Sequence, residues 1–161
     1  MKRALVVAAV LLDVLIPAVS GAAPAPTVCD FTLEVLISPG LSLTPGSATY
    51  QGEGGTVVCV GPVGGQQTTG AGTLSGAGVL GLFTGAVCPQ GVGGGTFSLS
   101  IPTSEGQVEQ TDDSTFNWAG SAGELSGERI STTFELTPLD GDCVSTPVTR
   151  AVIHMRGILG L

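Results

Sequence analysis

The 161-residue sequence contains 13 acidic and five basic side chains, for a formal net charge of −8, together with 26 glycines. An acidic surface repels nucleic-acid phosphates and anionic lipid headgroups, so we exclude nucleic-acid partners. The length is suited to one domain.

The N-terminal region has the pattern of a secretory signal peptide. Two basic residues precede an apolar run at 4–12, and small residues lead to the expected cleavage site after Ala22. Asp13 and Pro17 interrupt the apolar stretch, which argues against a retained membrane span of roughly 20 residues. We therefore expect a protein that is secreted or held in the cell envelope, without an integral membrane span after cleavage. The expected organisation is a signal peptide at 1–22, an Ala/Pro-rich segment at 23–28 and a single all-β domain at 29–161.

Apolar and polar residues alternate with a period of two after the signal peptide, which is typical of half-buried strands. In the first of these segments the alternation places Phe31, Leu33, Val35 and Ile37 on one face. The expected strands cover 29–37, 47–51, 55–60, 96–101, the two limbs of a hairpin at 106–120 and 123–137, and 147–157.

The middle of the chain, residues 61–95, is dense in glycine. A disordered low-complexity linker and a set of glycine-containing strands are the two interpretations. We favour strands, because Thr, Val, Leu and Phe stay interleaved with the glycines. The whole pattern predicts an all-β fold, a single antiparallel β-barrel of about eight or nine strands that leaves no open edges, with a β-sandwich as the alternative.

Four cysteines lie in the expected mature region: Cys29, Cys59, Cys88 and Cys143. An even number in an exported chain indicates two disulfides, and the wide spacing argues against a metal site. Three pairings are open. We favour Cys59–Cys88 with Cys29–Cys143, since the second bond would join the first strand to the last.

Few residues are candidates for chemistry. His154 is the only histidine, and it shares a strand face with Arg150 and Arg156. We expect a solvated face; if it lined the barrel interior, these three residues would form a candidate anion site, with Trp118 as a further ligand-binding candidate. No catalytic nucleophile motif is present, and we expect no cofactor, metal or catalytic residue.

Two acidic pairs, Asp112-Asp113 and Asp140-Gly-Asp142, are interpreted as turn residues, because Asp side chains stabilise turns. Neither pair completes a calcium-binding loop.

The stretch Leu125–Cys143, followed by Pro147-Val-Thr, resembles a group of small exported actinobacterial proteins without an assigned activity. The segments Pro39–Ser42 and Cys59–Pro62 are similar to them as well. The resemblance covers most of the expected mature chain, and it implies export but no functional residue.

Two classes of function follow. One is a secreted non-enzymatic protein that binds a small apolar or anionic ligand in a barrel. The alternative is a secreted interaction module, such as an inhibitor or a cell-envelope protein, with an extracellular protein as its partner. A barrel isomerase or cyclase is a distant third. An interior filled by side chains would argue against the first class.

Overall fold

The structure is a computed structural model that describes residues 26–82 and 85–160. The expected signal peptide, residues 1–22, lies outside the described residues. The regular secondary structure of the described residues is β-strand throughout. These residues include no helix long and apolar enough to cross a membrane. The strands are β1 (Thr27–Leu41), β2 (Ala48–Val60), β3 (Pro62–Val63), β4 (Gln66–Gln67), β5 (Gly72–Leu80), β6 (Gln90–Thr103), β7 (Gly106–Ala119), β8 (Ala122–Gly127), β9 (Ile130–Asp140) and β10 (Val148–Leu159).

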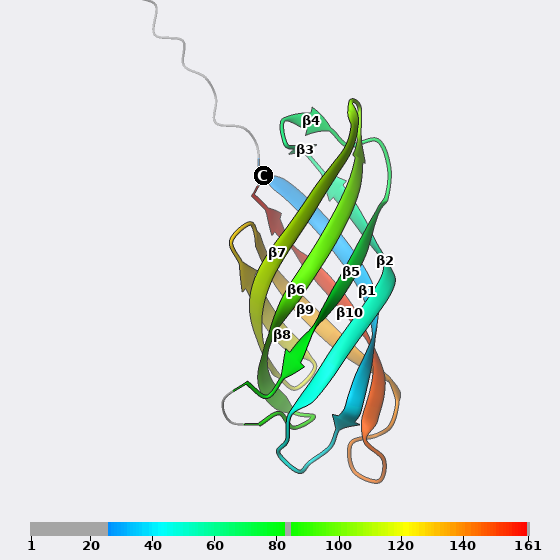
Figure 1. Ribbon diagram of the computed structural model, residues 1–161, viewed down its shortest axis with the longest axis vertical. Coiled ribbons are helices and arrows are strands. Elements are labelled where there is room, and N and C mark those ends of the chain that lie inside the picture. Colours follow the sequence, from blue (N-terminus) through cyan, green and yellow to red (C-terminus); the bar gives the residue numbers. More distant parts are fainter. Residues whose placement is uncertain (1–25, 83–84, 161) are drawn as a thin grey trace, which may run out of the picture.

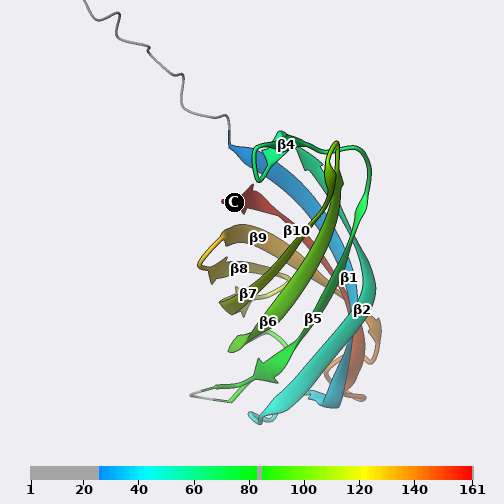
Figure 2. The same ribbon diagram turned by 45° about the horizontal axis from the view of Figure 1, so that its top comes forward.

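Eight of the described strands form one closed antiparallel barrel (Figures 1 and 2), in the order β1-β10-β9-β8-β7-β6-β5-β2. β1 closes the ring because it pairs with both β2 and β10: Cys29 faces Cys59 on one side and Gly157 on the other. Closure leaves no strand edge unpaired in the ring. The predicted barrel is therefore confirmed.

The barrel core follows from the alternation along the strands. The predicted inward face of β1 is buried, with Phe31, Leu33, Val35 and Ile37 each at most 4% exposed. Burying each such side chain contributes about 1.5–3 kcal/mol. At one end of the barrel the short hairpin β3–β4 places Val63 in the core, where it is fully buried.

The glycine-dense segment forms β5 and the beginning of β6, so the interpretation as strands is confirmed there. Its glycines make room for aromatic rings from the neighbouring strand, because a Cβ at Gly91 would overlap the Trp118 ring and one at Gly93 would overlap the Phe116 ring. The glycines of β6 therefore permit the large aromatic side chains of β7 to fit inside a narrow barrel.

Two expected strand boundaries are wrong. Residues 48–60 form one strand, β2, rather than two. The register of β2 against β5 shifts between Gly52 and Gly55, but the two strands remain paired on both sides of this irregularity. The expected limb at 123–137 is two strands, β8 and β9, joined by a turn at Glu128 and Arg129. The backbone N–H groups of both turn residues donate to the Asp112 carboxylate, at 3.0 and 2.9 Å.

The favoured disulfide pairing is also wrong. The bonds are Cys29–Cys59 and Cys88–Cys143, not Cys59–Cys88 and Cys29–Cys143. Cys29 and Cys59 face each other on β1 and β2, with Cα atoms 4.1 Å apart. Cys143 precedes the last strand and lies in a loop at the opposite end of the barrel from Cys29, so these two residues cannot meet.

Candidate functional site

The loops between β1 and β2, β5 and β6, β7 and β8, and β9 and β10 lie at one end of the barrel, at the bottom of Figure 1. We call this end the loop end; its described residues are 42–47, 81–82, 85–89, 120–121 and 141–147. The Cys88–Cys143 disulfide joins the β5–β6 loop to the β9–β10 loop, with Cα atoms 5.9 Å apart. Two loops on different sides of the ring are thereby linked covalently.

Hydrogen bonds connect the β5–β6 loop to its other neighbours. The Cys88 N–H donates to the Ser42 carbonyl at 3.0 Å, and the Gly120 N–H donates to the Pro89 carbonyl at 2.7 Å. From inside the barrel, Trp118 Nε1 donates to the Cys88 carbonyl at 3.2 Å. All of the loops at this end are therefore held to one another and to the core.

The β9–β10 loop is ordered by one carboxylate. Asp142 accepts hydrogen bonds from the Ser145 hydroxyl at 2.5 Å and from the backbone N–H groups of Thr146, Ser145 and Val144 at 2.8–3.0 Å. These bonds, that of the Ser145 hydroxyl first, hold the pKa of Asp142 well below its ordinary value. The interpretation of Asp142 as a turn residue is confirmed, whereas Asp140, the other acid of this pair, is the last residue of β9 and lies opposite Arg150 of β10.

The other predicted turn pair, Asp112-Asp113, is not in a turn. Both residues lie within β7: Asp112 points inward and is buried, whereas Asp113 is exposed and accepts a hydrogen bond from the Thr96 hydroxyl at 2.6 Å. The prediction failed because the alternation that buries Trp118 also places Asp112, six residues earlier, on the inward face.

The loop end presents exposed apolar side chains. Val144 is 79% exposed, Leu43 is 56% exposed and Leu82 is exposed as well; Leu139, close to this end in β9, is also exposed. By sequence, the segments 42–47, 81–89 and 120–121 contain no charged residue. Several large apolar side chains on fixed, largely uncharged loops are typical of an interaction surface.

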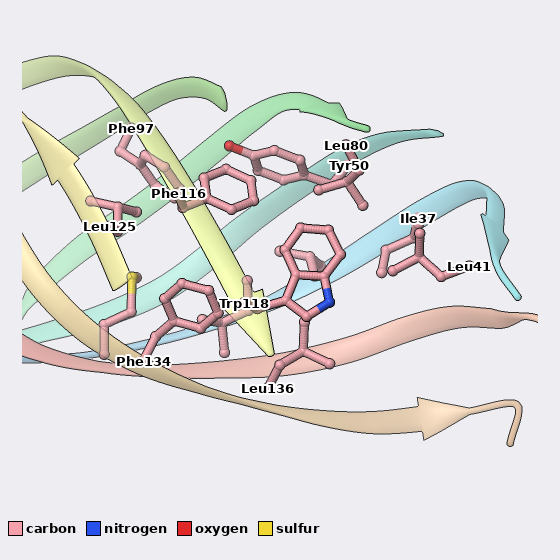
Figure 3. A pocket seen from close by; sticks show the side chains of 13 residues that line it. Ile37, Leu41, Tyr50, Leu80, Phe97, Phe116, Trp118, Leu125, Phe134 and Leu136 are labelled. Atoms are coloured by element: carbon pink, nitrogen blue, oxygen red, sulfur yellow. The ribbon is translucent and has the colours of Figure 1, made fainter. Parts of the chain in front are cut away.

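Inside the barrel, next to the loop end, thirteen of the described residues line an apolar cavity (Figure 3). Five of them are aromatic, and the Tyr50 and Phe116 rings meet edge to face with centroids 5.6 Å apart. The Tyr50 hydroxyl is buried without a hydrogen-bond partner among the described groups, and burial raises its pKa. The lining residues are Val35, Ile37, Leu41, Tyr50, Leu80, Phe97, Phe116, Trp118, Leu125, Phe134, Leu136, Ile153 and Met155.

The cavity measures about 30 Å³, which is enough for a water molecule or two. A drug-sized ligand occupies a site of roughly 300–1,000 Å³. Side chains therefore fill most of this part of the interior. Phe116, Leu136 and Ile153 point into the cavity but are only partly buried, so its edge meets solvent.

The structure separates the predicted ligand-binding residues. Trp118 is buried inside the barrel, whereas the His154 side chain is on the outer face, with Nδ1 3.2 Å from the Thr32 hydroxyl. Arg150 and Arg156 lie on the same outer face as His154. The four residues therefore do not form one site.

Both arginines are paired with carboxylates at the surface. Arg150 contacts Glu34 at 2.5 Å and Asp140 at 3.2 Å, and these hydrogen bonds raise the pKa of its guanidinium. Arg156 lies 3.6 Å from Asp30. Exposed pairs of this kind contribute little to stability.

The chain matches no protein-family model, no curated protein and no solved structure. Its architecture defines it as a disulfide-linked, eight-stranded antiparallel β-barrel. Sequence reasoning missed the loop end, because Leu43 and Val144 are isolated apolar residues in polar turns. The available signal was the absence of charge from the loops that flank the paired strands.

Proposed function

We propose that this chain is a secreted, non-enzymatic interaction module that binds an extracellular or cell-envelope protein through its loop end. The observation that carries the proposal is the exposure of Leu43, Leu82 and Val144 on loops that are held together by the Cys88–Cys143 disulfide and by the hydrogen bond from Cys88 to Ser42. The centre of a protein interface is depleted in charge and rich in apolar side chains, and the loop end has this composition.

Pre-organisation supports the same proposal. The hydrogen bonds around Cys88 and Asp142 order the loops before any partner arrives. A surface that is already ordered loses little conformational entropy on binding. Acidic side chains elsewhere on the barrel oppose non-specific attachment to anionic surfaces, which favours binding through the loops.

Secretion is part of this proposal. Two disulfides fit an oxidising, extracellular location. The signal-peptide pattern at residues 1–22 supports export through the general secretory route.

Val144→Glu is expected to weaken binding to washed envelopes of the producing cells at least about tenfold, because it places a charge in an apolar interface. The measurement is a binding isotherm of labelled mature protein, competed with unlabelled protein. Val60→Glu is the matched control, since Val60 is 76% exposed and lies at the opposite end of the barrel. Equal loss in both variants, or no loss in Val144→Glu, would refute the proposal.

A second candidate function is the binding of a small apolar molecule in the barrel. The observation that favours it is the unpartnered Tyr50 hydroxyl beside an aromatic cavity whose edge meets solvent. The filled interior argues against it, because a ligand would have to displace aromatic side chains. Organic extraction of protein purified from its native source, followed by mass spectrometry, separates the two: a stoichiometric apolar compound would favour this second function.

A further inference from the structure

A group of polar side chains is buried inside the barrel, away from the loop end. Gln110, Asp112 and Ser114 follow one another on the inward face of β7, and Thr132 lies on the inward face of β9. Each of the four is at most 5% exposed. They lie on the same faces as Phe116 and Phe134, further from the loop end, so the interior has a polar layer beside the aromatic one.

Most polar atoms of this layer have no protein partner. Gln110 Nε2 and Oε1, Ser114 Oγ and Thr132 Oγ1 are all buried without a hydrogen bond to any described group. Asp112 differs, because its two oxygens accept from the backbone N–H groups of Glu128 and Arg129. Native proteins rarely leave several neighbouring buried polar groups unpaired, so these four atoms require a partner.

Two glycines face the layer. Gly127 is opposite Ser114, and a Cβ built there would lie 2.5 Å from Ser114 Oγ and 2.7 Å from both Asp112 carboxylate oxygens. The hydroxyl and the carboxylate therefore converge on the position of a missing side chain. Gly157, which also lacks a side chain, is opposite Thr132 on β10.

We propose that Gln110, Ser114 and Thr132, with Asp112 beside them, form an internal hydration site that holds ordered water molecules. The unpartnered atoms include the Gln110 amide, which donates, the Gln110 carbonyl, which accepts, and two hydroxyls, which do both. Water satisfies all of them, because a buried water molecule typically makes about three hydrogen bonds and can donate and accept.

A bound ion fits these polar atoms less well than water does. A cation would leave the Gln110 amide hydrogens unpaired, and the Asp112 carboxylate would repel an anion. Within the part of the chain that is described, no cluster of three or more His, Cys, Asp or Glu side chains is placed to hold a metal ion.

The test combines a crystal structure at a resolution that shows water with ¹⁷O magnetic relaxation dispersion of the folded protein. We expect water density within hydrogen-bonding distance of at least two of Gln110, Ser114 and Thr132, and a long-lived water signal in solution. Thr132→Val and Ser114→Ala should each lower the number of long-lived waters. Thr115→Val, an exposed position on β7, should not change it.

A dry cluster, a bound ion in place of water, or a water count that is unchanged in both Thr132→Val and Ser114→Ala would overturn the proposal. The wild-type measurements decide the question alone if either variant fails to fold.

Discussion

Replacing both Cys88 and Cys143 with serine is expected to lower the free energy of unfolding by about 4 kcal/mol in the chain-entropy model. The bond joins residues separated by 55 positions, so its loss frees a long loop in the unfolded chain. It also releases the β9–β10 loop from the β5–β6 loop, and we therefore expect weaker envelope binding. Urea unfolding and the envelope binding isotherm measure the two effects.

The matched control is the pair Cys29→Ser and Cys59→Ser. Its disulfide joins residues 30 positions apart, so the expected loss of stability is similar, roughly 3.5 kcal/mol. This bond lies far from the loop end, and its removal should leave binding unchanged while the protein is folded. Equal binding by the two double variants under folding conditions would show that the loop-to-loop bond does not organise the binding surface.

Asp112→Ala is expected to destabilise the protein by about 3 kcal/mol, because it removes two hydrogen bonds to a buried carboxylate and a hydrogen bond to a charged group contributes about 1.5–3 kcal/mol. The variant removes the only acceptor recorded for the N–H groups of Glu128 and Arg129 within the described structure. Urea unfolding gives the stability, and amide hydrogen exchange at these two residues should accelerate.

Asp113→Ala controls for the loss of one negative charge from β7. Asp113 is exposed and contacts the Thr96 hydroxyl, so we expect a loss of less than about 1 kcal/mol. If Asp112→Ala and Asp113→Ala lowered the free energy of unfolding equally, the β8–β9 turn would not depend on the buried carboxylate of Asp112.

The barrel was predictable because alternation is a local property of each strand. Phe31 to Ile37 on β1 and Ile130 to Leu136 on β9 show which face is buried without knowledge of the neighbouring strands. The number of such segments, together with the need to remove edges, then leads to closure.

The disulfides and the β8–β9 turn depend on register, which the alternation of single strands does not specify. Cys29 bonds to Cys59 because β1 and β2 are aligned there, and several alignments share the same alternation. The β8–β9 turn was not predicted because no Pro lies in it. Its sequence signal is a break in the alternation: the buried side chain of β8 is at an odd-numbered residue, Leu125, whereas those of β9 begin at an even-numbered one, Ile130.

The candidate site was less predictable than the fold. Its surface is composed of loop residues far apart in sequence, such as Leu43 and Val144, which the topology brings to one end of the barrel. Exposed apolar residues scattered singly are ordinary, so neither residue is informative alone.

The most direct test of the loop end as the binding surface is site-specific photo-cross-linking in the cells that export the protein. A photoreactive residue at Leu43 or Val144 should cross-link to the same partner protein, excess unlabelled mature protein should compete, and a photoreactive residue at Val60 should not form this product. Cross-linking of that partner from Val60 with equal efficiency, or no specific product from either loop position, would contradict the account.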